Sequence, residues 1–263
     1  MTTNTHAKTN TKAITVTHLD HVATIILERP PHNFVDADVI RELADQLEAL
    51  DSNANCRAVV LAANGKVFCA GADLSSSNGA AASDTAAALY MHAMRLFRTT
   101  KPIVAAVHGP AIGAGLGLAL VADFRVTCEA ARYSASFTRL GFHPGFGLTT
   151  TLPNLIGTQK AALLFYTGRR IDGAQAFAMG IADELVPEAE VRTRAIALAR
   201  EIATSAPQAI LSTRSELRRG LADKITEGNL REQKFQQAQF ATADFKEGIA
   251  ASTERRAPMF TGK

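Results

Sequence analysis

Two stretches rich in glycine and alanine have backbones that can take part in chemistry. Residues 111–120 read AIGAGLGLAL and follow the apolar run IVAAVHGP, while residues 68–74 read FCAGADL and follow the apolar run RAVVLAA. Small side chains allow a ligand to approach backbone N–H groups closely. Two N–H groups that converge on one carbonyl oxygen stabilise the charge that develops on it during acyl transfer or enolate formation. The two stretches therefore predict a main-chain site for an oxyanion.

A phosphate-binding loop is the alternative explanation for the glycines at 113, 115 and 117. The dinucleotide fingerprint Gly-x-Gly-x-x-Gly needs a third glycine at position 118, which is Leu118 in this chain. A nucleoside-triphosphate loop needs Gly-Lys-Ser or Gly-Lys-Thr, and neither follows the glycines. These departures argue against a nicotinamide-dependent dehydrogenase and against an NTP-binding protein. For Gly115 alone, close packing of a helix against a strand is the simpler explanation.

The pattern of apolar residues predicts the elements that must bring the two stretches together. Two short strands come first, and buried strands then alternate with helices until about residue 155, after which helices dominate. We expect strands over 14–19, 22–28, 57–63, 102–109 and 123–129, and helices over 36–51, 113–122, 158–166, 172–179 and 223–250, with others that end near 98 or begin near 187 and 207. This order predicts parallel pairing with right-handed crossovers and an α/β core. Both stretches then lie at the carboxyl edge of the sheet, where ligands bind in such folds.

At 263 residues and 47% apolar content, the chain has the length and composition of one large domain, or of one domain plus a short appendage. We expect a disordered tail over 1–12, the α/β core over 13–200 and a helical region over 201–263. The 28 basic and 25 acidic residues nearly balance, which argues against a nucleic-acid partner. Three cysteines lack metal-ligand spacing, and the sequence shows neither a signal peptide nor a membrane span. A cytoplasmic protein without a metal and without a membrane partner is the expectation.

Six ordered motifs resemble the enoyl-CoA hydratase/isomerase, or crotonase, family. The three central ones are NGKVFCAGADL, KPIVAAVHGPAIGAGLGLALVADFRV and LGFHPGFGLTTTLPNLIG, and the others are ERPPHNFVDADVI, TGRRIDGAQAFAMGIADELVP and TADFKEGIAASTERRAPMFTGK. The resemblance covers about residues 13–263. It implies a spiral of β-β-α units with a C-terminal helical region for trimerisation and cover of the active site. It also implies a homotrimer or dimer of trimers that acts on an acyl-CoA thioester, with coenzyme A as part of the substrate and no separate cofactor.

Matched residue by residue, the resemblance assigns the two N–H groups of the oxyanion hole to Ala72 and Ala114. Ala72 is the second alanine of the AGAD turn, and Ala114 stands in the Gly113-Ala114-Gly115 triplet at the start of a helix. Gly113 is thereby expected at the substrate. Relatives often have glycine at position 114, and the alanine here keeps the N–H while it adds a methyl group to the pocket.

Contacts to the coenzyme A portion of the substrate are implied in the same way. Ala70 and Leu74 match backbone positions that contact the adenine in relatives, and Lys66 lies where it can meet a phosphate. Phe260 and Lys263 match tail positions that approach the coenzyme A of a neighbouring subunit. The resemblance therefore assigns part of the substrate site to the C-terminal tail.

The chain departs from the family at both glutamates that hydratases use for proton transfer. Their positions are occupied by Gly117 and Phe137, neither of which can exchange a proton, and Phe137 is expected to form an apolar wall of the acyl pocket. His143 in GFHPGFG is the candidate replacement acid or base, since histidine is the residue type that exchanges protons near neutral pH. We therefore expect slow hydration, and isomerase, lyase, decarboxylase or hydrolase chemistry in its place. The alternative is a CoA-thioester-binding protein with little or no catalysis.

Other side chains with chemical potential receive weaker assignments. Tyr90, His92 and Arg95 lie on one predicted helix, and the spacing does not decide which of them lines the acyl pocket. Cys69 resembles a nucleophile only by residue type, because no histidine partner can be assigned to it, and a buried inert thiol is the better interpretation.

Overall fold

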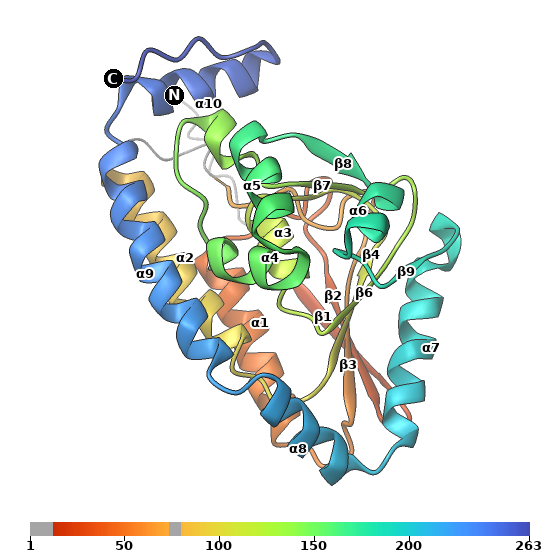
Figure 1. The fold of residues 1–263 in the computed structure, drawn as a ribbon. Helices are drawn as coiled ribbons and strands as arrows, with labels where there is room; N and C mark the ends of the chain where they lie inside the picture. Colours follow the sequence, from red (N-terminus) through yellow and green to blue (C-terminus); the bar gives the residue numbers. More distant parts are fainter. Residues whose placement is uncertain (1–12, 74–79) are drawn as a thin grey trace, which may run out of the picture.

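The computed structural model describes residues 13–73 and 80–263, which form two β-sheets surrounded by helices (Figure 1). The strands are β1 (Ile14–Leu19), β2 (Val22–Leu27), β3 (Ala58–Ala63), β4 (Ile103–Val107), β5 (Ala111–Ile112), β6 (Phe124–Thr127), β7 (Arg132–Ser134), β8 (Arg170–Asp172) and β9 (Glu184–Leu185). The α-helices are α1 (Ala37–Asp51), α2 (Ala80–Leu96), α3 (Ala114–Ala119), α4 (Leu148–Ile156), α5 (Thr158–Thr167), α6 (Gly173–Met179), α7 (Val191–Thr204), α8 (Pro207–Leu217), α9 (Leu221–Gln239) and α10 (Ala243–Glu254). Two short 3-10 helices are η1 (Ser136–Leu140) and η2 (Glu188–Glu190). Within the described ranges, no helix is long and apolar enough to cross a membrane.

The larger sheet has the strand order β1-β2-β3-β4-β6-β9. β1 is antiparallel to β2 with Ile14 opposite Leu27, and every later neighbour is parallel. Every residue of β3 and β4 is buried, as expected for parallel strands that are covered on both faces. The predicted parallel pairing of the strands at 57–63, 102–109 and 123–129 is therefore confirmed.

Helices cover both faces of this sheet. α7 packs against β2, β3, β4 and β6, and α1 and α2 lie on the opposite side, with α9 outside α2 (Figure 1). α1 begins where the Asp36 side chain accepts a hydrogen bond from the N–H of Val39 at 2.9 Å, as an N-cap does. The helix expected over 36–51 is thus present, and its buried residues recur at helical spacing: Val39, Ile40, Leu43, Ala44, Leu47 and Leu50.

A smaller sheet of order β5-β7-β8 lies beside the carboxyl edge of the larger one. β5 follows β4 after three residues, and an isolated parallel bridge joins its first residue, Ala111, to Cys69 in the turn after β3. The smaller sheet thus ties together the two segments that leave β3 and β4. This connection fixes the relative position of the two glycine-rich turns.

The C-terminal part differs from the sequence prediction in the short strands β8 and β9, which were not predicted, and in the last long helix. The single helix expected over 223–250 is wrong: α9 ends at Gln239 and α10 begins at Ala243. Thr242 starts the second helix, because its side chain accepts a hydrogen bond from the N–H of Phe245 at 3.1 Å. The interruption lets Phe240 point into the protein, where it is 2% exposed.

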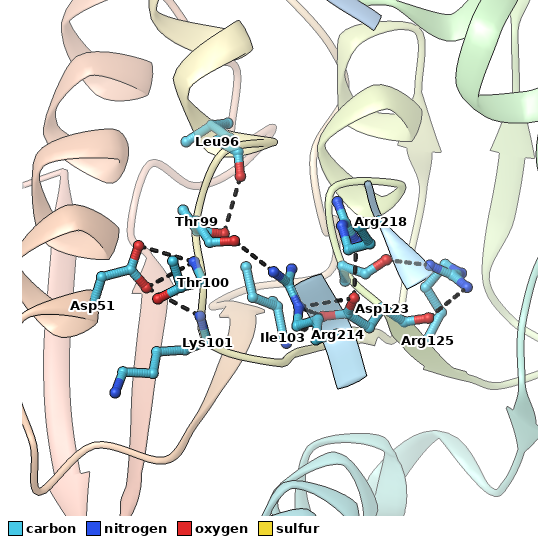
Figure 2. Close-up of polar contacts among 11 residues, drawn as sticks. Asp51, Leu96, Thr99, Thr100, Lys101, Ile103, Asp123, Arg125, Arg214 and Arg218 are labelled. Carbon is cyan, nitrogen blue, oxygen red and sulfur yellow. Dashed lines mark hydrogen bonds and ion pairs between the residues drawn. The ribbon is translucent and has the colours of Figure 1, made fainter. Parts of the chain in front are cut away.

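At the amino edge of the larger sheet, a partly buried carboxylate, that of Asp123, connects β4, β6 and α8 (Figure 2). Asp123 accepts hydrogen bonds from the N–H of Ile103 at 2.8 Å and from Nε of Arg214 at 2.9 Å, and it pairs with Arg218 at 2.8 Å. Arg125 is 2% exposed and donates to the Asp123 carbonyl oxygen at 3.2 Å. These contacts anchor the amino end of β4, whose other end leads into the second glycine-rich turn.

Candidate active site

The turns that follow β3 and β4 meet in one small cavity of about 80 Å³. Residues 70–72 of the first turn and residues 112–114 of the second line it. The two backbones touch, since the N–H of Ile112 donates to the Cys69 carbonyl oxygen at 3.0 Å. A Cβ on Gly71 would lie 3.0 Å from the Ile112 carbonyl oxygen, and Gly71 has a φ of 111°, so this close approach requires glycine.

The first turn is held by a parallel bridge between Val35 and Ala72. Val35 donates to the Gly71 carbonyl oxygen at 3.0 Å and accepts from the N–H of Asp73 at 3.3 Å. In such a bridge the two neighbours of Ala72 make the hydrogen bonds, so the N–H of Ala72 itself points to the other side. No acceptor for that N–H occurs among the residues that the structure describes.

The second turn ends in a glycine that starts α3. Gly113 has φ 55° and ψ −117°, and its N–H donates to the Ser134 carbonyl oxygen at 2.9 Å. Ala114 is therefore the first helical residue, and the first N–H groups of a helix have no acceptor within it. In the described parts of the chain the Ala114 N–H makes no hydrogen bond. Two available N–H groups, one from each turn, thus belong to residues that line the same cavity.

Gly115 has a packing role, as its sequence suggested. A Cβ at this position would lie 2.1 Å from the Cys69 carbonyl oxygen, so a larger residue would push α3 away from the first turn. Cys69 itself is fully buried, its Sγ lies 3.9 Å from the Gly71 carbonyl oxygen, and burial raises the pKa of its thiol to about 12. A thiol with this pKa stays protonated at neutral pH and is not a nucleophile.

Aromatic side chains form the far wall of the cavity. Phe137, Phe142 and Phe240 line it, and their rings form a cluster with Phe245, with ring centroids between 4.9 and 5.6 Å apart. A Cβ on Gly113 would lie 3.8 Å from Cζ of Phe137, so this ring lies close to the second turn. The position of one family glutamate is thus part of an apolar wall.

At Gly117, the position of the other family glutamate, the ring of Phe146 occupies the space that a side chain would need. A Cβ on Gly117 would lie 2.6 Å from Cγ and Cδ1 of Phe146, which is fully buried and has a φ of 65°. Glu232 of α9 holds this segment, because its carboxylate accepts from the N–H groups of Gly147 and Thr149, both at 2.8 Å. The sequence identified the loss of the glutamate at 117 but not the ring that takes its space.

Among the described residues that line the cavity, the polar side chains belong to Tyr90 and Ser136. Gln236 donates from Nε2 to the Tyr90 hydroxyl at 3.2 Å and to the His143 carbonyl oxygen at 2.8 Å. Burial raises the pKa of Tyr90, so its hydroxyl keeps its proton and can donate it in a hydrogen bond. Of the described residues that line this cavity, none is Asp, Glu, His or Lys.

His143 lies in a neighbouring cavity and not with the two turns. Its Nδ1 is 2.7 Å from the Pro144 carbonyl oxygen, which can only accept, so Nδ1 carries a proton in this contact. The imidazole stacks on Phe235 with centroids 5.0 Å apart. The structure therefore does not bring the candidate acid or base to the cavity that contains the predicted oxyanion groups.

The other predicted site residues are dispersed. Ala70 lines the cavity, and Lys66 is exposed on the loop that leads to the first turn. Leu74 lies outside the described residues. In the tail, Phe260 is 42% exposed and the Lys263 carbonyl oxygen accepts from the N–H of Asp244 at 3.0 Å.

Of the three candidates on α2, only Tyr90 lines the cavity. Arg95 points away, since it pairs with Asp45 at 2.6 Å and with Glu48 at 2.7 Å on α1. His92 lies beside it, with Nδ1 3.3 Å from the Arg95 guanidinium. Phe142 and Phe240, which form part of the aromatic wall, were not identified as site residues from the sequence. Phe142 nevertheless stands inside LGFHPGFG, the motif from which His143 was selected.

Comparison with known proteins identifies relatives of this chain. Residues 18–263 match the family model of enoyl-CoA hydratase/isomerase. Enoyl-CoA hydratase domain-containing protein 2, mitochondrial, of Mus musculus is 34% identical over 273 residues, which cover 98% of this chain and 92% of that protein. Crystal structures of an enoyl-CoA hydratase/isomerase from Pseudoalteromonas atlantica and an enoyl-CoA hydratase from Bacillus anthracis superimpose with TM-scores of 0.85 and 0.76. Their identities are 30% and 32%, and the matches cover 95% and 96% of this chain and all of each structure.

Proposed function

Because the chain belongs to the enoyl-CoA hydratase/isomerase family, we propose that it binds an acyl-CoA thioester and polarises its carbonyl group. The thioester oxygen accepts hydrogen bonds from the N–H groups of Ala72 and Ala114. As the α-carbon or the carbonyl carbon reacts, negative charge develops on this oxygen, and the two N–H groups stabilise it. The coenzyme A portion is part of the substrate, so no further cofactor is required.

The observation that supports this proposal is the convergence of the two turns on one cavity. Each turn contributes an N–H group that has no acceptor among the described residues. Both groups are held by backbone contacts, the Val35–Ala72 bridge and the bond from Gly113 to Ser134, so they need little reorganisation when charge develops. Preorganised donors of this kind are the main source of stabilisation in such sites.

The same cavity disfavours efficient hydration. Addition of water to a conjugated thioester needs one group that activates water and another that delivers a proton, and each such group contributes roughly 10²–10⁴-fold to the rate. Among the described residues that line the cavity, only Tyr90 and Ser136 offer exchangeable protons, and the raised pKa of Tyr90 excludes it as a base at neutral pH. An isomerase, lyase, decarboxylase or hydrolase reaction that depends mainly on oxyanion stabilisation fits better.

A CoA-thioester-binding protein with little catalysis is the second candidate. It is favoured by the absence of Asp, Glu, His and Lys from the described residues that line the cavity. Both candidates share the binding mode, and they differ only in whether the bound thioester is converted.

We also propose a trimer or a dimer of trimers, in line with the family. Asp244 accepts from the N–H groups of Thr261 and Gly262 at 2.7 and 2.9 Å and so folds the tail onto α10. This leaves Met259 77% exposed and Phe260 42% exposed, as expected for side chains that a neighbouring subunit covers. Light scattering at micromolar concentration tests this assembly, and a monomeric mass contradicts it.

One experiment separates the candidates. The protein is incubated with a set of acyl-CoA thioesters that includes crotonyl-CoA, binding is measured by thermal shift and calorimetry, and products are identified by mass spectrometry. Binding with a new product supports an enzyme, and binding without one supports the second candidate. Absence of binding to every thioester contradicts both, and rapid formation of 3-hydroxybutyryl-CoA contradicts the expectation of slow hydration.

A further inference from the structure

A second and larger cavity of about 490 Å³ lies behind the aromatic wall of the first. Its lining is mostly apolar and includes Pro144, Pro153, Ala161 and Phe165. Phe142 is the one residue, among those the structure describes, that lines both cavities. The second cavity therefore adjoins the first across this residue.

The ring of Phe142 belongs to the wall of the smaller cavity. It packs against Phe137 at 5.4 Å, Phe240 at 5.1 Å and Phe245 at 5.6 Å between centroids, and the residue is 5% exposed. The backbone beside it is held firmly, since a Cβ on Gly141 would lie 2.5 Å from the Asp244 carbonyl oxygen. Removal of the ring should therefore open space without letting residue 142 move in to fill it.

The smaller cavity limits what can follow the thioester carbonyl. Its volume of about 80 Å³ is about one sixth of the 490 Å³ of the second cavity. Resting on the proposed function, we propose that this protein selects short acyl groups, and that the Phe142 ring sets the limit by separating the acyl cavity from the larger apolar one. A short chain ends at the ring, whereas a chain of eight carbons has to displace it.

The test compares butyryl-CoA with octanoyl-CoA by calorimetry on the full-length protein and on three variants. Phe142→Ala removes the ring, Phe142→Leu is a milder change in case the first variant does not fold, and Phe245→Leu changes a ring of the same cluster that lines neither cavity. Each methylene that gains a buried apolar site improves Kd by about fourfold, so four more can improve it by up to about 200-fold. We expect the unmodified protein and Phe245→Leu to prefer butyryl-CoA, and the Phe142 variants to shift the ratio toward octanoyl-CoA by at least about tenfold.

The outcomes distinguish this inference from the function on which it rests. If the unmodified protein binds octanoyl-CoA as tightly as butyryl-CoA, or if neither Phe142 variant changes the ratio, the role of Phe142 is refuted while acyl-CoA binding stands. An equal shift in Phe245→Leu refutes it as well, because loosening of the cluster would then explain the result. If the unmodified protein binds neither thioester, the proposed function itself fails.

Discussion

Proline in place of Ala114 removes one N–H group from the cavity and leaves the local fold in place. Ala114 is the first residue of α3, the position at which proline is best tolerated in a helix. The preceding residue, Gly113, has a ψ of −117°, outside the α-helical region that a following proline disfavours. The N–H of Ala114 has no acceptor in the described structure, so no hydrogen bond within the protein is lost.

The expected loss differs between binding and reaction. A neutral hydrogen bond to the ground-state carbonyl contributes about 0.5–1.5 kcal/mol, so Kd for the acyl-CoA should rise by about 2- to 13-fold. One donor of an oxyanion hole contributes about 2.7–4 kcal/mol in the transition state, so turnover should fall by roughly 10²–10³-fold. Turnover is measured on the acyl-CoA that the protein converts, and isotope-edited infrared spectroscopy of a ¹³C-labelled thioester carbonyl reports polarisation even where no turnover occurs.

Two matched variants control for side effects. Ala243→Pro places proline at the first residue of α10, which is exposed and follows an extended Thr242, so binding and turnover should stay unchanged. Ala114→Gly keeps the N–H and removes only the methyl group, so the carbonyl stretch should remain shifted. If folded Ala114→Pro protein retains full turnover and an unchanged carbonyl stretch, the oxyanion hole has been assigned to the wrong group.

Three further predictions concern residues that hold the site. Gly117→Ala should lower the free energy of unfolding, measured in urea, by about 1–3 kcal/mol, because the added Cβ meets Phe146. In a Phe146→Ala background the same substitution should lose most of that cost. Additive effects of the two substitutions in this double-mutant cycle would contradict the contact. Asp123→Ala should lower the free energy of unfolding by up to about 3–5 kcal/mol, because it leaves Arg214 and Arg218, whose side chains are only 10% and 17% exposed, without their partner. Asp38→Ala, in the exposed pair with Arg41, should cost at most about 1 kcal/mol, and equal losses would refute the anchoring role of Asp123. Burial raises the pKa of Glu232 in the folded protein, so its contribution to stability is fully present below the unfolded pKa and is lost as the pH rises through the folded pKa. Urea titrations of the unmodified protein and of Glu232→Gln from pH 4 to pH 8 should therefore diverge as the pH rises, with the unmodified protein losing more, and parallel curves would contradict the shift.

Local sequence was sufficient for the framework and for the two turns. Apolar runs identified β3 and β4, because strands that are buried on both faces need continuous apolar residues, and the expected strands β1, β2 and β6 are present beside them. Glycines and alanines after two of these strands predicted that the backbone would be accessible there, and parallel strands bring such turns to one edge. These inferences depend on residues that are close in the chain, so the sequence alone could support them.

What surrounds the turns depended on contacts between distant segments. Position 117 is filled by Phe146, the acyl wall includes Phe240 from the break between α9 and α10, and His143 faces another cavity. The LGFHPGFG motif contains both Phe142 and His143, but which of the two side chains lines the cavity is decided by α10, which packs against η1 and the residues after it. Side-chain direction and the volume left between packed helices are properties of the assembled fold, so periodicity and motif spacing could not supply them.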